Sequence, residues 1–343
     1  MRRLLNSLFV TTEDAYLTLD GENVVVRQGD TERMRFPLHT LRNIIAFTYA
    51  GASPALMGAC ADRGISLSFC TPNGRFLART TGNSNGNVLL RRTQYRVADD
   101  MVKSCEVART MIFGKIYNAR WSIDRTLRDH ALRVDEEKLS KAAIQMHEAL
   151  PKVKNAVNLE SLRGIEGEAA SAYFGIFDEL ILRDKEYFYF HTRNRRPPLD
   201  NVNAMLSFVY ALLKNDCASA LEAVGFDSYV GFLHRDRPGR NSLALDLMEE
   251  LRPCLADRLV LTMINKGMVN VKDFEKRESG AVMMNDAGRK RLIKAWHERG
   301  QDVITHPYTK EKLPWGLVPY MQAMLLARYL RGDLDGYPPF LWK

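Results

Sequence analysis

Glu166 is an acidic residue at a position where a helix should be apolar. Over residues 158–177 (NLESLRGIEGEAASAYFGIF), a helical wheel at about 100° per residue puts Glu166 on one stripe with Leu162 and Tyr173, and puts Glu168 on the far side. A carboxylate that faces a packed surface is unfavourable unless it is paired or binds a cation. A buried pair with an arginine and a ligand role therefore both stay open.

His234 opens a second stretch of unusual charge, residues 234–253 (HRDRPGRNSLALDLMEELRP). Neighbouring positive charges disfavour protonation of a histidine, and neutral imidazole is the form that binds metal ions. The loop after His234 carries arginines, which suit a phosphate backbone because a guanidinium binds it through paired donors. These arginines are Arg235, Arg237 and Arg240.

An acidic edge follows on the helix expected over about 242–251. Asp246, Glu249 and Glu250 are spaced i, i+3 and i+4, so they share the side opposite the apolar residues and repel one another unless a cation lies near. Taken alone, this edge is better explained as a solvated face whose partners are Arg252 and the upstream arginines. The helical pattern leaves Glu249 and Glu250 equivalent as candidate ligands.

An inward glutamate, a neutral histidine and an acidic helix edge together form a mixed oxygen and nitrogen donor set. Such a set favours Mg²⁺ or Mn²⁺ over a zinc site built on thiolates, and nearby arginines indicate phosphodiester chemistry. The sequence contains no GxxxxGK[ST], GxSxG or HExxH motif, so other enzyme classes find little support. The candidate side chains lie on helices far apart in the sequence, which the fold must bring together.

The first part of the chain, residues 1–81, consists of short segments rich in β-branched and aromatic residues, which predict strands. Asp20-Gly21 and Gln28-Gly29 are expected turns between them. The uncharged segment 44–61 is interrupted by Ser53-Pro54, which are typical of a helix N-cap and first helical residue. A strand followed by a buried helix explains this segment better than a membrane span.

Residues 82–88 are polar and contain glycine, which indicates a linker, and from 89 to 343 apolar residues recur at helical spacing. The sequence thus predicts an α+β protein with a β-rich, sandwich-like domain over 1–81 and a larger, irregular all-α domain over 89–343. The length of 343 residues and the hydrophobic content of 46% are sufficient for two such domains.

The formal net charge of +8 and the pI of about 9.2 are compatible with a polyanion partner such as nucleic acid, but many proteins are equally basic for no specific reason. Five cysteines without a CxxC pair argue against a disulfide framework and a zinc ribbon. The start of the chain, MRRLLNSLFVTTED, is unlike a signal peptide. A reducing cytoplasm is the expected location.

Three motifs in the order GIEGEAASAYF (164–174), NRRPPLDNVNAMLSFVYALL (194–213) and GFLH…SLALDLMEELRP (231–253) resemble those of the CRISPR-associated adaptation integrases, the Cas-one family. GKIYNAR (114–120) and YPPF (337–340) agree with the same pattern. The resemblance covers essentially the whole chain. The segments LSFVYALL and SLALDLMEELRP are most similar in sequence to the type I-C branch.

The resemblance implies that Glu166, His234 and Glu249 are the catalytic ligands of a Mg²⁺ or Mn²⁺ ion. It thereby separates Glu249 from Glu250, which the helical wheel could not do. Asp246 is expected to support the site rather than to bind the metal directly, and Tyr173 is expected to pack against the site or orient it.

The implied reaction is a metal-assisted transesterification. The 3′-hydroxyl of a short DNA duplex attacks a phosphodiester of the CRISPR repeat and inserts a new spacer, and with water as nucleophile the same site is an endonuclease. The implied partners are the double-stranded prespacer, the repeat DNA, a second copy of the chain and a Cas-two protein, in the prokaryotic cytoplasm and without a membrane. The alternative is a non-catalytic DNA-binding scaffold in which Glu166 and Glu249 are only salt-bridged.

Further basic residues are candidates for phosphate contacts near the site. Some of them precede Pro197-Pro198 and a helix that Asp200 is expected to cap. For each, a phosphate contact and an ordinary solvated position are about equally supported, and Asn203 matches a family position without a role that its chemistry suggests. These basic residues are Arg193, Arg195, Arg196, Lys115 and Arg120.

Overall fold

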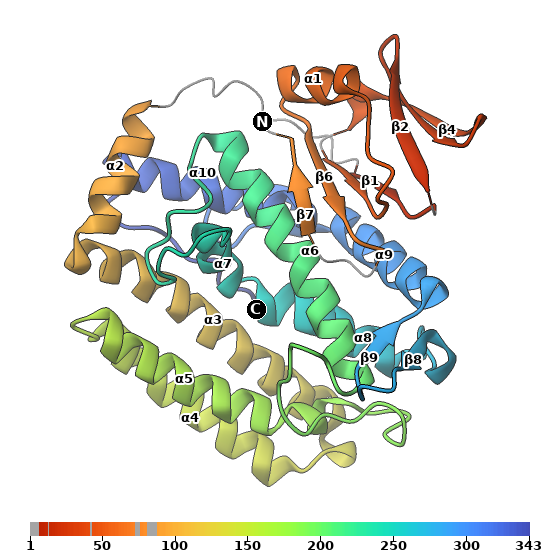
Figure 1. Ribbon diagram of the computed structural model, residues 1–343. Helices are drawn as coiled ribbons and strands as arrows, with labels where there is room; N and C mark the ends of the chain where they lie inside the picture. The colour runs from red at the N-terminus through yellow and green to blue at the C-terminus, as the bar shows by residue number, and fades with distance from the viewer. Residues whose placement is uncertain (1–6, 13, 42, 73–75, 81–87) are drawn as a thin grey trace.

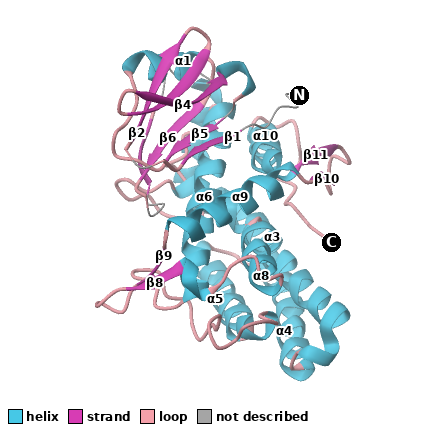
Figure 2. Ribbon diagram, turned by 90° about the vertical axis from the view of Figure 1, so that its right-hand side faces the viewer, coloured by secondary structure: helices cyan, strands magenta, loops and turns pink. Residues whose placement is uncertain are grey.

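The computed structural model in Figure 1 describes residues 7–12, 14–41, 43–72, 76–80 and 88–343. A strand-rich N-terminal part is followed by a larger helical part, which confirms the predicted α+β class. Figure 2 shows the strands of the first part gathered at one end of the molecule and most of the helices at the other.

Two sheets form the N-terminal part. One has the order β1-β5-β6-β7 and is parallel except at β7, and the other is the antiparallel sheet β2-β3-β4. Gly21 and Gly29 adopt left-handed φ angles of 56° and 57° at the two predicted turns of the second sheet. Leu17, Ile44 and Leu56 come from the two sheets and from α1 and share one apolar core, as expected for a sandwich-like arrangement. The elements are β1 (Ser7–Val10), β2 (Ala15–Asp20), β3 (Asn23–Gln28), β4 (Thr31–Pro37), β5 (Asn43–Ala46), α1 (Pro54–Asp62), β6 (Ser66–Cys70) and β7 (Phe76–Arg79).

The helical part surrounds the long helix α3, which packs against α4, α5 and α7. Asp100 begins α3 by accepting hydrogen bonds from the backbone N–H groups of Val102 and Lys103. The helices are α2 (Val88–Asp99), α3 (Met101–His130), α4 (Glu136–Lys154), α5 (Leu159–Gly175), α6 (Asn201–Val224), α7 (Ser242–Glu249), α8 (Arg258–Asn265), α9 (Asp286–Gln301) and α10 (Val318–Leu330), with a π-helical turn over Arg252–Asp257.

Two short β-hairpins interrupt the helical part. The predicted all-α domain over 89–343 did not include them. They pair β8 (Phe274–Lys276) with β9 (Val282–Met284), and β10 (Val303–Thr305) with β11 (Lys312–Pro314). Strands of three residues are too short to give a clear alternating pattern in the sequence. Of the predicted linker 82–88, residues 82–87 lie outside the described residues, and Val88 already belongs to α2.

The segment 44–61 forms strand β5 and helix α1 as predicted, but α1 is buried only on the face that carries Leu56 and Cys60. The Ser53 side chain accepts a hydrogen bond from the Leu56 backbone N–H, and Pro54 takes the first helical position. Within the described part of the chain, no helix is both long enough and apolar enough to cross a membrane. All five cysteines are buried free thiols, in agreement with the predicted lack of a disulfide framework.

The segment with the YPPF motif returns to the GKIYNAR segment of α3. Asn118 donates one hydrogen bond of 2.7 Å to the Glu250 carbonyl oxygen and another of 2.7 Å to the Phe340 carbonyl oxygen. A Cβ atom added to Gly114 would lie 3.0 Å from the Glu250 Cβ atom and 3.2 Å from the Pro339 Cβ atom. Glycine at position 114 therefore allows α3, the end of α7 and the C-terminal segment to pack closely.

We expect Gly114→Ala to lower the free energy of unfolding by about 1–3 kcal/mol, because the added methyl group overpacks this contact. Gly167→Ala is the matched control, since Gly167 also lies inside a helix but has no heavy atom within 4 Å of the added Cβ. That change should raise stability slightly through its better helix propensity. Urea denaturation measures both, and equal stability of the two variants would contradict the packing argument.

Asp216 of α6 couples stability to pH. Burial raises the pKa of its carboxyl to about 7, and a hydrogen bond of 3.2 Å from the Trp296 indole N–H only partly opposes this. The unfolded carboxyl ionises near pH 4, whereas the folded one stays protonated up to about pH 7. The stability that this group contributes is therefore lost as the pH rises from about 4 to above 7.

We expect Asp216→Asn to match the wild type in stability near pH 4 and to exceed it by about 2–4 kcal/mol at pH 8, because the amide stays neutral. Urea denaturation at several pH values measures the difference. Asp62→Asn is the control at an exposed aspartate and should leave the pH dependence unchanged. A gap between Asp216→Asn and the wild type that does not grow with pH would contradict the assignment.

Candidate active site

Helix α5 holds Glu166 at the edge of its buried face. The side chain of Asn158 caps the helix by accepting a hydrogen bond of 2.8 Å from the Ser161 backbone N–H. Leu162 and Tyr173 of the predicted stripe are buried, Glu168 is exposed as predicted, and the Glu166 side chain is 26% exposed. Glu166 can therefore interact with the protein interior and with solvent at the same time.

Helix α7 is buried on all sides, so the predicted solvated acidic edge is wrong. Asp246, Glu249 and Glu250 are 0%, 6% and 0% exposed, while Leu243 and Leu247 of the predicted apolar arc are also buried. Buried carboxylates are strongly unfavourable without hydrogen-bond donors or cations. Each of the three acids has its own set of such partners.

Asp246 fixes the loop that carries His234. Its carboxylate accepts hydrogen bonds from the backbone N–H groups of Phe232 (2.6 Å), Leu233 (2.9 Å) and His234 (3.0 Å). The Nδ1–H of His234 donates a further hydrogen bond of 2.6 Å to Asp246, an assignment that follows from the carboxylate being an acceptor. The lone pair of the imidazole then lies on Nε2. A Cβ atom on Gly231 would approach an Asp246 oxygen to 2.8 Å, so only glycine lets the loop wrap this closely.

Glu249 shares a cation with Glu166. Lys115 of α3 forms an ion pair with Glu166, and its Nζ lies 2.7 Å from Glu249. Arg252 binds both oxygens of Glu249, at 2.9 Å and 3.0 Å. Burial raises the pKa of Glu249, but the positive charges of Arg252 and Lys115 outweigh this and hold the pKa well below its ordinary value. Glu249 is therefore an ionised carboxylate.

Glu250 points the opposite way, into the interior. It accepts hydrogen bonds from the Tyr337 hydroxyl, from the Gln322 amide (3.0 Å) and from the Phe340 backbone N–H (2.8 Å). Burial raises its pKa to about 7, although these three donors oppose the rise. Of the two glutamates that the helical wheel left equivalent, only Glu249 shares the ammonium of Lys115.

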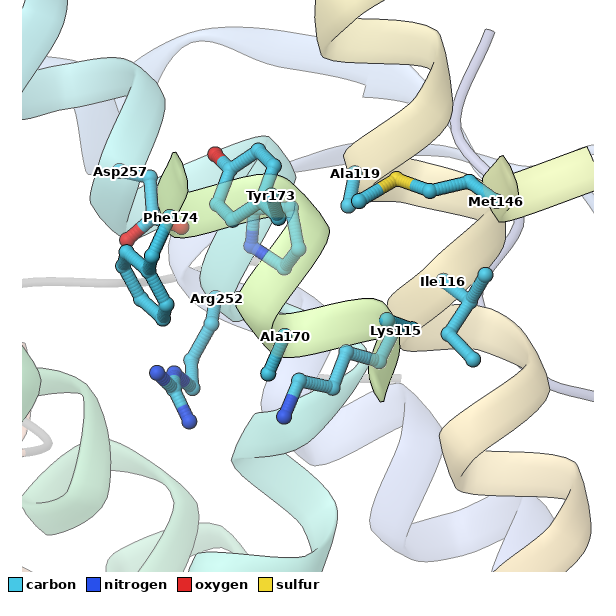
Figure 3. Close-up of a pocket in the computed structure, with 11 residues that line it drawn as sticks. Lys115, Ile116, Ala119, Met146, Ala170, Tyr173, Phe174, Arg252 and Asp257 are labelled. Carbon is cyan, nitrogen blue, oxygen red and sulfur yellow. The ribbon is translucent and has the colours of Figure 1, made fainter. Parts of the chain in front are cut away.

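A small pocket opens beside these charges. Figure 3 shows Lys115 and Arg252 extending past the turn of α5 that carries Tyr173 and Phe174. The buried Tyr173 ring packs against Phe174, with ring centroids 5.4 Å apart, and forms part of the wall of the pocket. This fits the packing role expected for Tyr173. Asp257, from the π-helical turn after α7, lines the pocket on the same side as Tyr173 and Phe174.

Arg193 is linked to this site through one tyrosine. Its guanidinium lies 5.2 Å from the Tyr210 ring centroid and donates a hydrogen bond of 2.6 Å to Asn203. The Arg252 guanidinium lies 4.5 Å from the same ring, and the Tyr210 hydroxyl donates a hydrogen bond of 2.5 Å to Asp257. Asp200 caps α6 as predicted, and Asn203 in its first turn anchors the Arg193 loop.

The other predicted basic residues lie at different depths. Arg195, Arg196, Arg235 and Arg237 are exposed and Arg240 is half-buried. Arg120 contacts His147 of α4 at 2.9 Å and Asp124 at 3.3 Å, so it is bound along the α3–α4 side rather than to the glutamates. The sequence predicts Lys115 only as a phosphate contact or a solvated lysine, whereas in the structure it pairs with the two glutamates. The signal in the sequence was that an inward-facing glutamate such as Glu166 needs a nearby cation. Several basic residues could have supplied that cation equally well.

Within the described residues, no three histidine, cysteine, aspartate or glutamate side chains are placed to hold a metal ion together. Glu166 and Glu249 converge on the ammonium of Lys115, and His234 is hydrogen-bonded to Asp246, which lies one turn before Glu249 on α7. Two carboxylates and an imidazole nitrogen are a suitable donor set for Mg²⁺ or Mn²⁺. The residues thus fit the predicted ion in their chemistry, with a protein cation between the two carboxylates.

Comparisons with known proteins agree with the resemblance found in the sequence. The family model described as CRISPR associated protein Cas1 matches residues 8–298. A CRISPR-associated endonuclease Cas1 from Chlorobaculum tepidum is 50% identical over 343 residues, which cover 100% of both chains.

Two solved structures show the same fold. A casposase bound to integration product has a TM-score of 0.83 at 23% identity and covers 99% of this chain and 94% of its own. A chain of a Cas6-RT-Cas1–Cas2 complex has a TM-score of 0.81 at 24% identity and covers 98% of this chain and 36% of its own. With the family model matching most of its length, the chain belongs to the Cas1 family of CRISPR-associated proteins.

Proposed function

We propose that this protein is a metal-dependent DNA integrase and endonuclease of CRISPR adaptation, which joins a DNA 3′-hydroxyl to a phosphodiester of the CRISPR repeat. The observation that carries the proposal is the meeting of Glu166 and Glu249, from helices far apart in the chain, on a single cation. His234 is held by Asp246, one turn before Glu249 on α7. The name of the Chlorobaculum tepidum relative, an endonuclease, supports the reaction class. The type I-C assignment stays a prediction.

The chain's own residues have distinct roles in this proposal. Glu166, Glu249 and Nε2 of His234 would hold a Mg²⁺ or Mn²⁺ ion, which when bound supplies Lewis-acid polarisation of the phosphoryl group. Arg252 keeps Glu249 ionised and fixed in orientation. Asp246 is a positioning residue, because both of its oxygens already accept hydrogen bonds from the His234 loop.

The surroundings of Glu166 leave room for DNA. Gly164 and Gly167 flank it on α5, and an added Cβ at either position would meet no heavy atom within 4 Å. Exposed arginines of the 193–196 and 235–240 loops supply phosphate contacts in the proposal. Its partners are the prespacer duplex, the repeat DNA, a second copy of this chain and a Cas2 protein, the last being a component of the complex that contains a chain of the same fold.

A non-catalytic DNA-binding scaffold is the second candidate, and the Lys115 contacts favour it. One ammonium already neutralises part of the charge on Glu166 and Glu249, so the two glutamates could act as a structural link between α5 and α7. The two candidates differ in one assay. A scaffold binds DNA without joining or cutting it, whereas an integrase requires the two carboxylates for chemistry.

We expect Glu166→Gln and Glu249→Gln each to lower strand joining by ~100-fold or more, because each removes a charged metal ligand. The assay contains the protein, its Cas2 partner, Mn²⁺, a duplex with free 3′-hydroxyls and repeat DNA. Affinity for DNA should stay within about twofold, since the phosphate contacts remain. Glu168→Gln on the exposed side of α5 is the matched control. Normal joining by the two variants would refute the metal-ligand role of the two glutamates, whereas a wild type that binds DNA without joining or cutting it would favour the scaffold.

We expect Asp246→Asn to lower joining by ~10–100-fold, the range seen when a group that orients a metal ligand is lost. The amide cannot accept from the loop N–H groups as the carboxylate does, so the tautomer and orientation of His234 should become mixed. Nitrogen chemical shifts of the His234 ring report this directly. Asp236→Asn, at an exposed acid of the same loop, is the control. An unchanged His234 tautomer in Asp246→Asn would refute the positioning role.

A further inference from the structure

Lys115 occupies the place between the two glutamates. Its ammonium pairs with Glu166 of α5 and lies 2.7 Å from Glu249 of α7, and its side chain is only 11% exposed. Two carboxylates held this close repel each other in the absence of a cation, and the repulsion is strong because water is largely excluded. In the protein as described, the ammonium is the group that allows both acids to remain ionised.

The charges around the glutamates already balance. Lys115 and Arg252 carry two positive charges against the two negative charges of Glu166 and Glu249. A divalent cation between the glutamates would bring two further positive charges next to the ammonium, in a poorly hydrated site where like charges repel strongly. The ammonium and a divalent ion therefore cannot both lie between the glutamates.

Lys115 is the cation that can leave. Arg252 binds both oxygens of Glu249, lies over the Tyr210 ring and donates a hydrogen bond of 3.3 Å to the Tyr210 hydroxyl, so several contacts hold it in place. A lysine has a flexible four-carbon stem and a compact charge. The pocket of Figure 3 runs along Lys115 towards Asp257 and gives that stem room for other rotamers.

We propose that Lys115 is a built-in counter-ion that holds Glu166 and Glu249 together in the metal-free protein and is displaced when a divalent cation binds. The inference rests on the proposed function in taking the two glutamates as metal ligands. It adds that the affinity for the metal is set by competition with the protein's own ammonium. The displaced ammonium, together with Arg252, leaves positive charge beside the site for a phosphate oxygen of the DNA.

The test compares Mn²⁺ binding to the metal-free wild type and to Lys115→Met, by titration calorimetry and by the electron paramagnetic resonance signal of free Mn²⁺. Lys115→Met should bind Mn²⁺ at least ~10-fold more tightly, because the competing charge is gone. Its melting temperature should be lower than that of the wild type without metal and should rise more when Mn²⁺ is added. Lys103→Met, at an exposed lysine of the same helix that pairs with Asp100, should match the wild type.

Lys115→Arg keeps the positive charge, so the proposal can still be tested if Lys115→Met does not fold. A guanidinium can bind the carboxylates through paired donors, so this variant should bind Mn²⁺ more weakly than the wild type. Two results would overturn the displacement of Lys115: Lys115→Met binds Mn²⁺ no more tightly than the wild type, or Lys115→Arg binds Mn²⁺ as tightly as Lys115→Met. If the wild type still binds Mn²⁺ and joins DNA, either result leaves the proposed function intact. If the wild type joins DNA although it does not bind Mn²⁺, the metal role in the proposed function is overturned as well.

Discussion

The burial of three carboxylates on the short helix α7 is the constraint on which the arrangement of the helical part depends. Asp246, Glu249 and Glu250 are at most 6% exposed, and a buried carboxylate without donors would destabilise the fold by several kcal/mol. The donors come from separate regions of the chain. The loop before α7 serves Asp246, α3 and the π-helical turn serve Glu249, and the C-terminal segment serves Glu250.

Helix α3 contributes three neighbouring residues with different functions to this arrangement. Gly114 provides space for Glu250, Lys115 provides charge for Glu249, and Asn118 provides an amide that links α7 to the C-terminal segment. The π-helical turn after α7 places Arg252 against Glu249 and Asp257 against Tyr210. Wide turns of this kind are frequent at functional sites, and here the turn serves both the site and the core.

Much of the fold could be predicted from the sequence, because strand alternation, glycine turns and helix caps are local signals. Ser53, Gly21 and Asp200 each did what their chemistry predicts. The wheel placed Glu166 on the buried stripe of α5, and the structure places it at the edge of that buried face. The burial of α7 could not be predicted from its sequence. A helix with one apolar and one acidic face has the same sequence pattern in both cases. Its acidic side chains can be solvated, or they can be buried against hydrogen-bond donors from distant parts of the chain.

For the same reason the partners that lie far from the acids in the sequence could not be predicted. Lys115 lies 51 residues from Glu166 in the sequence, and no local spacing distinguishes it from the other basic residues that could neutralise an inward glutamate. Arg252 was correctly expected to pair with the acidic edge, since it lies within one helical turn of Glu249. Long-range pairing is a property of the packed helices, so it is visible only once the fold is known.

The hydrogen bonds to Glu250 also bear on how the chain folds while it is being synthesised. Tyr337 and Phe340 lie 87 and 90 residues after Glu250, so a ribosome has made all of α7 long before it makes these donors. During that interval Glu250 lacks the groups that stabilise it in the interior, so we expect α7 to take its final position next to α3 only later. We expect the pairing of Lys115 with Glu249, one residue before Glu250, to follow the synthesis of residues 337–340. The site would in this way form only after the segment around residues 337–340 has been made.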